Sequence, residues 1–95
     1  MAKYLVTYDL VGTSETSADY ERLIDKIKSY PNWGKIQKSV WLVKSSKSAA
    51  TVRDELLNYM DSNDRLFVIN VTGTAAWRNV LCTTEWLKSF LRSSS

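Results

Sequence analysis

The feature that most constrains the fold of this chain is the order of its strand-like and helix-like hydrophobic patterns. Three segments rich in β-branched and aromatic residues are typical of strands: residues 3–10, 33–45 and 65–71. A tight turn near Ser39 would divide the second of them into two strands. Two segments repeat apolar residues every three or four positions, which indicates amphipathic helices: the stretch between Thr16 and Pro31, and residues 49–60. The order is therefore strand, helix, strand, strand, helix, strand.

This order predicts an α+β fold, a ferredoxin-like βαββαβ sandwich with two helices on one face of the sheet. We expect a single domain over residues 1–95, with a core at 3–72 and a C-terminal extension at 73–95 that contains a third helix capped by Thr83 or Thr84. The second sheet face would need the C-terminal segment or a partner to exclude water. A homodimer that packs sheet against sheet is the simplest solution, because so small a domain buries a modest fraction of its surface.

The last predicted strand, residues 65–71, is an almost unbroken apolar run. Such runs are expected where a strand is covered on both faces. Ser48 is expected to cap the helix before it, and the apolar stripe of that helix would run from Ala49 through Val52 and Leu56 to Tyr59 or Met60.

Asp9 stands near the end of a strand-like segment, although strands avoid aspartate. The apolar face of this strand carries Tyr4, Val6, Tyr8 and Leu10, so Asp9 lies on the opposite face. A carboxylate there could hold a divalent cation, because Mg²⁺ often takes only one or two carboxylates together with water and phosphate. The alternative is that Asp9 caps the turn that follows it. The residues alone leave both interpretations open.

A second candidate site is the mixture of lysine and tryptophan in residues 33–47. Basic residues interleaved with aromatic ones can bind phosphates and stack on bases. The alternative is an ordinary strand pair whose lysines are solvated and protect a sheet edge, and Lys35 and Lys38 would fall on opposite faces of a regular strand. Gln37 and Ser39, two polar residues of this segment, could contact phosphate or satisfy a local turn. The candidate nucleic-acid contacts are Lys35, Gln37, Lys38, Ser39 and Lys44.

Composition excludes several kinds of site. The chain has no His and one Cys, so zinc sites built on those residues and acid–base chemistry by histidine are excluded. A formal net charge of +3 permits a nucleic-acid partner without requiring one. Because no apolar run approaches the ~18 residues of a membrane span and the N-terminus lacks a signal-peptide pattern, we expect a cytoplasmic protein without a membrane partner.

Two short stretches together resemble one protein family. "YLVTYDL" at residues 4–10, followed by a loop and a helix, resembles the start of the Cas-two family of CRISPR-associated proteins. "GKIQKSVWLV" at residues 34–43 resembles the second signature of that family, an Arg/Lys-x-Gln-x-Ser-Val-aromatic segment in which Gln37 and Ser39 match the signature residues. The chain is also similar to the related VapD-type toxins. The resemblance covers roughly residues 3–72.

The resemblance implies a ferredoxin-like homodimer in which Asp9 matches an acidic residue proposed in the family to bind a metal near the dimer axis. The family includes metal-dependent nucleases and structural subunits that hold DNA for the CRISPR integrase. This chain departs from it in a first helix without an arginine-rich surface and in a Trp-rich segment at residues 73–92. In both respects it looks more like stand-alone members of the family.

Three functions follow as hypotheses. A dimeric endonuclease or endoribonuclease would use Asp9 as its catalytic and metal-binding residue, with Mg²⁺ as the cofactor that activates water. A non-catalytic nucleic-acid-binding or assembly subunit would rely on the lysines and tryptophans of residues 33–47. A protein-interaction module would use the Trp-rich C-terminal segment. The expected partners are thus a second copy of the chain and RNA or DNA.

Overall fold

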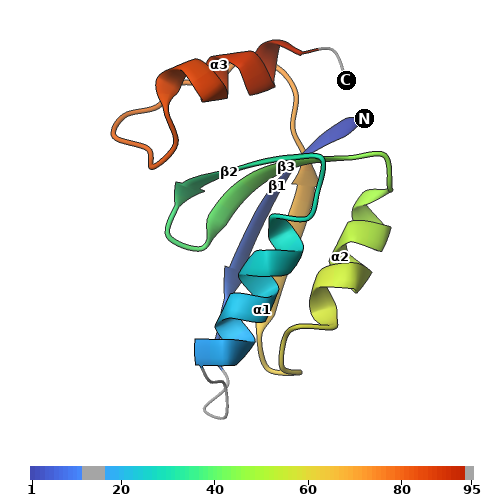
Figure 1. The fold of residues 1–95 in the computed structure, drawn as a ribbon. Coiled ribbons are helices and arrows are strands. Elements are labelled where there is room, and N and C mark those ends of the chain that lie inside the picture. Colours follow the sequence, from blue (N-terminus) through green and yellow to red (C-terminus); the bar gives the residue numbers. More distant parts are fainter. Residues whose placement is uncertain (12–16, 94–95) are drawn as a thin grey trace.

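The computed structural model describes residues 1–11 and 17–93, which contain four strands and three helices (Figure 1). In chain order the elements are β1 Ala2–Asp9, α1 Ser17–Ile27, β2 Asn32–Gln37, β3 Val40–Ser45, α2 Ala49–Leu57, β4 Arg65–Asn70 and α3 Thr84–Arg92. The side chains expected to cap the first helix, Thr16 or Ser17, lie outside the described residues.

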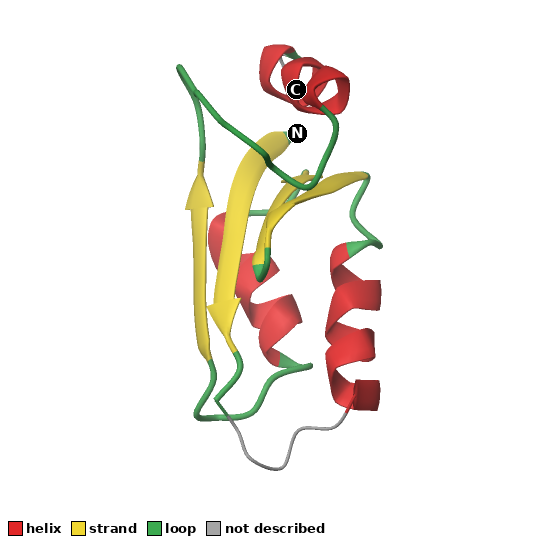
Figure 2. Cartoon of the chain, turned by 90° about the vertical axis from the view of Figure 1, so that its left-hand side faces the viewer, coloured by secondary structure: helices red, strands yellow, loops and turns green. Residues whose placement is uncertain are grey.

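The four strands form one antiparallel sheet in the order β2-β3-β1-β4, with β2 and β4 at its edges. α1 and α2 cover one face of the sheet, and α3 lies on the other face near one end (Figures 1 and 2). The prediction of an α+β fold is confirmed, and the strand order is compatible with a ferredoxin-like arrangement.

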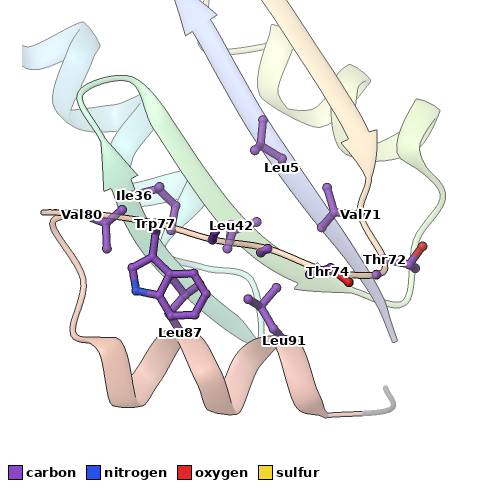
Figure 3. Close-up of a pocket in the computed structure, with 13 residues that line it drawn as sticks. Leu5, Ile36, Leu42, Val71, Thr72, Thr74, Trp77, Val80, Leu87 and Leu91 are labelled. Carbon is purple, nitrogen blue, oxygen red and sulfur yellow. The ribbon is translucent and has the colours of Figure 1, made fainter.

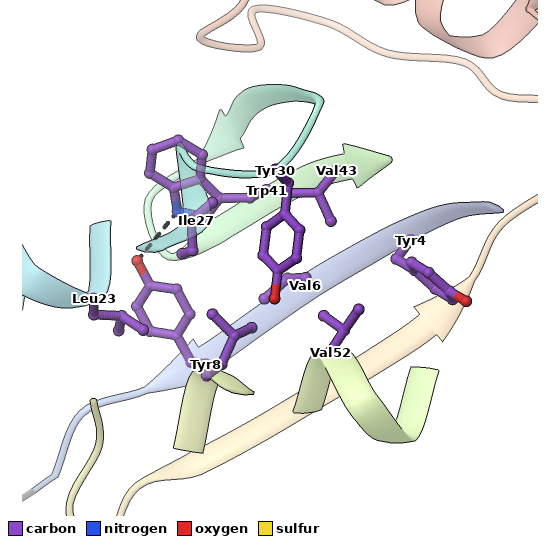
Figure 4. Close-up of a cluster of buried hydrophobic side chains, with 10 residues drawn as sticks. Tyr4, Val6, Tyr8, Leu23, Ile27, Tyr30, Trp41, Val43 and Val52 are labelled. Carbon is purple, nitrogen blue, oxygen red and sulfur yellow. Dashed lines mark hydrogen bonds between the residues drawn. The ribbon is translucent and has the colours of Figure 1, made fainter. Parts of the chain in front are cut away.

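The main core lies between the sheet and the first two helices. Tyr4, Val6 and Tyr8 point from β1 into this layer, as the alternation predicts, and meet Leu23 and Ile27 from α1 (Figure 4). Burying each large apolar side chain contributes ~1.5–3 kcal/mol before the loss of chain entropy. The Trp41 indole Nε1 donates a hydrogen bond to the Tyr8 hydroxyl at 3.1 Å, so the polar atoms of these two buried residues satisfy each other.

The turn at Ser39 and the helix cap at Ser48 are found where the sequence predicts them. Ser39 has a φ of 62° in the turn between β2 and β3, which confirms the division of residues 33–45. Ser48 caps α2, because its Oγ accepts a hydrogen bond from the Thr51 amide at 3.1 Å. The helix ends at Leu57, three residues earlier than expected, and Tyr59 is exposed. Of the two residues expected to end the apolar stripe, Tyr59 is thus excluded, whereas Met60, beyond the helix end, packs against the core.

α3 closes part of the second sheet face. Its Leu87 and Phe90 are buried against Leu42 of β3, and Thr83 caps the helix by accepting a hydrogen bond from the Trp86 amide at 3.1 Å. The packing is incomplete, since an apolar cavity of about 310 Å³ remains between the helix, the sheet and the segment before the helix (Figure 3).

β4 differs from the prediction of a strand covered on both faces. Leu66 and Val68 pack on the main core, whereas Phe67 and Ile69 are 58% and 44% exposed. The reason is that β4 is an edge strand, whereas α3, on the same face as Phe67 and Ile69, packs over Leu5, Ile36 and Leu42 of the other strands. Within one chain β4 is therefore covered on one face, while Val71, the last residue of the predicted run, packs against the cluster beneath α3.

Candidate functional site

Asp9 is the last residue of β1 and points away from the two-helix face, as predicted. Its side chain is 70% exposed. Arg65 lies opposite it in the register of β4, and the Arg65 Nη1 and Asp9 Oδ2 atoms are 4.0 Å apart. An ion pair this long and this exposed contributes little to stability. The pair therefore places one anion and one cation, both accessible, at the same end of the sheet.

These two residues border a shallow depression of about 140 Å³ on the sheet surface. Thr7 and Phe67 add a hydroxyl and an exposed aromatic ring to its lining. Tyr8 also borders it but points its ring into the core, where burial raises its pKa to about 12. Tyr8 thus stays protonated at neutral pH and adds no charge to the depression.

Within residues 1–11 and 17–93, no three His, Cys, Asp or Glu side chains gather closely enough to hold an ion among themselves. Asp64, the acidic residue before β4, accepts hydrogen bonds from the Val11 and Asp61 amides, each at 2.8 Å. Asp9 alone fits a Mg²⁺ ion whose other ligands are water and substrate phosphate, or one shared with a second carboxylate.

The hairpin turn lies close to the end of β1. The Tyr8 amide donates a hydrogen bond to the Ser39 carbonyl at 3.2 Å, and Thr7 pairs with Val40. Gln37 and Lys38, which are exposed, come directly before Ser39 in the chain. The structure therefore brings Asp9, Ser39, Lys38 and Gln37 to one end of the sheet.

The two remaining lysines of the candidate set lie on different faces. Lys35 lies at the β2 edge, with its Nζ 5.5 Å from the centre of the Trp41 ring. Lys44 is buried beneath α3, where its ammonium group donates to the Ser93 hydroxyl and lies 5.3 Å from the centre of the Phe90 ring. The five predicted nucleic-acid contacts thus do not form one continuous patch.

Two basic residues near these sites were not among the sequence candidates. Arg65 joins Asp9 through the pairing of β1 with β4. Lys28, just after α1, places its Nζ 5.3 Å from the centre of the Trp33 ring. The short connection from Ile27 to Asn32 is the signal that would have found Lys28, because it forces the helix end to lie beside the start of β2.

No helix among those described combines the length and apolar character that a membrane span requires. A comparison with protein-family models gives a match over residues 1–79 to the family described as CRISPR associated protein Cas2. This match contains every strand of the sheet and ends before α3. It supports a CRISPR-associated role in nucleic-acid processing. On the strength of this match and of the strand order, the chain belongs to the CRISPR associated protein Cas2 family.

Proposed function

We propose that the chain acts as a homodimeric, metal-dependent nuclease in which Asp9 binds the metal ion. The observation that carries this proposal is the position of Asp9. It is an exposed carboxylate at the end of the central strand β1, beside a cation and on the sheet face that α1 and α2 leave open. Family membership adds support for a nucleic-acid substrate.

The face that carries Asp9 also supports a dimer. Phe67 and Ile69 are exposed there as neighbours of Arg65 on β4. Burying each of them against a second copy would contribute ~1.5–3 kcal/mol. In a two-fold arrangement across this face, each copy supplies the same residues, so two Asp9 carboxylates could share one ion.

Each residue at the site has a distinct chemical task in this proposal. A Mg²⁺ ion, when bound, would polarise the phosphodiester and supply an activated water. Asp9 holds the ion in place. Arg65 binds a phosphate oxygen, which its guanidinium group suits better than a compact ammonium group does. Lys38 and Gln37, exposed at the hairpin turn, contact the substrate backbone next to the bond that is cut.

The test is cleavage of labelled single-stranded RNA and DNA in the presence of Mg²⁺. Asp9→Asn preserves the size of the side chain and removes its charge, so we expect a loss of ~10²–10³ in rate, as for other electrostatic groups at active sites. Asp54→Asn is the matched control, because Asp54 is an exposed carboxylate on α2. Equal rates for Asp9→Asn and the wild type would refute the proposal.

A second candidate is a non-catalytic nucleic-acid-binding subunit. It is favoured by the absence of a group of metal-binding side chains within the described residues. In this case the wild type binds nucleic acid without cutting it, and Asp9→Asn leaves the affinity unchanged. The protein-interaction hypothesis for the C-terminal segment gains less support, because the side chains of Leu87 and Phe90 are buried against the chain's own sheet.

A further inference from the structure

The sheet edge formed by β2 carries a groove that the Asp9 site does not use. The groove has a volume of about 530 Å³ and runs between the start of β2 and the segment that leads into α3. β2 and β4 are opposite edges of the sheet. A dimer built on the exposed face of β4 would therefore leave this groove accessible.

One wall of the groove contains Trp33 and Lys35, and Trp41 and Lys28 lie next to these two residues outside the groove. Trp33 is 38% exposed, and its ring centre lies 6.0 Å from that of Trp41, which is buried. The Lys28 Nζ lies 5.3 Å from the centre of the Trp33 ring, and the Lys35 Nζ lies 5.5 Å from the centre of the Trp41 ring. Trp41 is itself fixed by its hydrogen bond to Tyr8. The exposed indole is thus held rigidly from behind, with a cation near each ring.

The opposite wall is fixed to the strand. Trp86 from α3 lies directly on Gly34, where an added Cβ would come within 2.3 Å of the indole ring. The Trp86 Nε1 donates to the Asn32 Oδ1 at 3.2 Å, and the Leu81 amide donates to the Ile36 carbonyl at 3.0 Å. Gly34 therefore allows α3 to lie close to β2, and the groove is preformed.

We propose that this groove binds an unpaired base of a single-stranded nucleic acid, with the base stacked on Trp33 and the flanking phosphates held by Lys28 and Lys35. Base stacking on an aromatic side chain is sequence-tolerant and needs an unstacked base, which a duplex does not offer. The lysines supply the salt-dependent attraction for the backbone. A base that arrives on Trp33 displaces the Lys28 ammonium group from the ring and leaves it close to a phosphate.

The groove suits a nucleic acid better than an extended peptide. None of the described residues that line it is acidic: Pro31, Asn32, Trp33, Gly34, Lys35, Leu81, Cys82, Thr83 and Trp86. A peptide strand added to β2 would compete with the Leu81 amide, which already donates a hydrogen bond to the Ile36 carbonyl.

This site is independent of the proposed nuclease, because Asp9 takes no part in it.

The test is binding of fluorescent oligothymidylate of about 12 nucleotides, a common site size for single-strand binding, at low salt in EDTA. EDTA removes divalent cations, so the oligomer is not cut and the binding result does not depend on whether the proposed nuclease activity exists. Trp33→Leu keeps an apolar side chain but removes the stacking surface, so we expect affinity to fall by on the order of tenfold or more. Trp33→Tyr keeps an aromatic face and should retain most of the affinity.

An abasic oligomer of equal length and charge separates stacking from electrostatics. Trp33→Leu should leave its binding unchanged, whereas Lys28→Glu and Lys35→Glu should weaken the binding of both oligomers and flatten the salt dependence. Lys88→Glu, an exposed lysine on α3, is the matched charge control and should have a smaller effect on both. The proposal is overturned if Trp33→Leu binds oligothymidylate as the wild type does, if duplex DNA binds as well as the single strand, or if only peptides bind.

Discussion

The two faces of the sheet are closed in different ways. On one face, α1 and α2 meet β1 and β3 in a continuous core that includes completely buried side chains such as Leu23, Ile27 and Leu56. On the other face, α3 covers one part, leaves an apolar cavity of about 310 Å³ beneath it, and does not reach Phe67. The first face is completed within one chain. The second has apolar surface left over.

This difference distinguishes the sheet face that forms the main core from the sheet face that leaves surface open to a partner. The match to the Cas2 family contains the closed face and every strand, but it stops at residue 79, before α3 begins at Thr84. Asp9, Arg65 and Phe67 all lie on the second face or at its edge. The incompletely covered face is therefore where a partner, an ion or a substrate has room.

The largest expected effect is a difference between matched truncations on the two faces. Leu23→Ala should lower the free energy of unfolding by about 4 kcal/mol, because a fully buried site in a tight core cannot collapse around the missing atoms. Leu87→Ala should cost less, about 2 kcal/mol, because Leu87 already borders the cavity under α3. Urea denaturation of both variants measures this. Equal losses would mean that the second face is packed as tightly as the first.

Sequence reasoning reaches further into the closed face than into the open one. The alternation of Tyr4, Val6 and Tyr8 is local and predicts their burial directly, and the turn at Ser39 follows from the break between two apolar runs. In contrast, the burial of Lys44 depends on a contact with Ser93, 49 positions along the chain. No pattern within β3 contains that information.

The candidate site was predicted to a similar, partial extent. Asp9 was found because an aspartate is unusual in a strand and because it matches the family's first signature. Its neighbour Arg65 depends on the pairing of β1 with β4, and the contact of Lys28 with Trp33 depends on how α1 meets β2. Lysine and arginine are common on surfaces, so the pairing of β1 with β4 distinguishes Arg65 from the other basic residues, and the position of α1 beside β2 distinguishes Lys28.

The next effect concerns the exposed part of the second face. Phe67→Glu places a charge where the proposed dimer buries an aromatic ring, so it should weaken self-association by tenfold or more, equivalent to about 1.4 kcal/mol. Sedimentation equilibrium measures the dissociation constant. Leu81→Glu is the control, because Leu81 is 63% exposed but lies beside β2, at the other sheet edge. If Leu81→Glu dissociates the dimer and Phe67→Glu does not, the interface lies at β2 instead.

The smallest effect concerns the charged side chains that connect the helices to the sheet on each of its two sides. On the closed side, the Glu55 carboxylate on α2 accepts hydrogen bonds from the Lys47 ammonium group and, at 2.8 Å, from the Tyr30 hydroxyl. These bonds, that from Lys47 first, hold the pKa of Glu55 below its ordinary value of 4.5. On the open side, Lys3 and Lys44 donate to the Leu91 carbonyl and the Ser93 hydroxyl near the end of α3, so no carboxylate takes part in these contacts.

Acid should therefore weaken the closed side through Glu55. Because the pKa of this carboxyl is lower in the folded state, its contribution is complete above the unfolded value of 4.5 and is lost as the pH falls through the folded value. Thermal unfolding from neutral pH to about pH 3 should show a steeper loss in the wild type than in Glu55→Gln, which keeps hydrogen-bonding atoms but does not titrate. Asp54→Asn, on the exposed side of the same helix, should follow the wild type. Parallel curves for Glu55→Gln and the wild type would mean that this cluster does not couple protonation to folding.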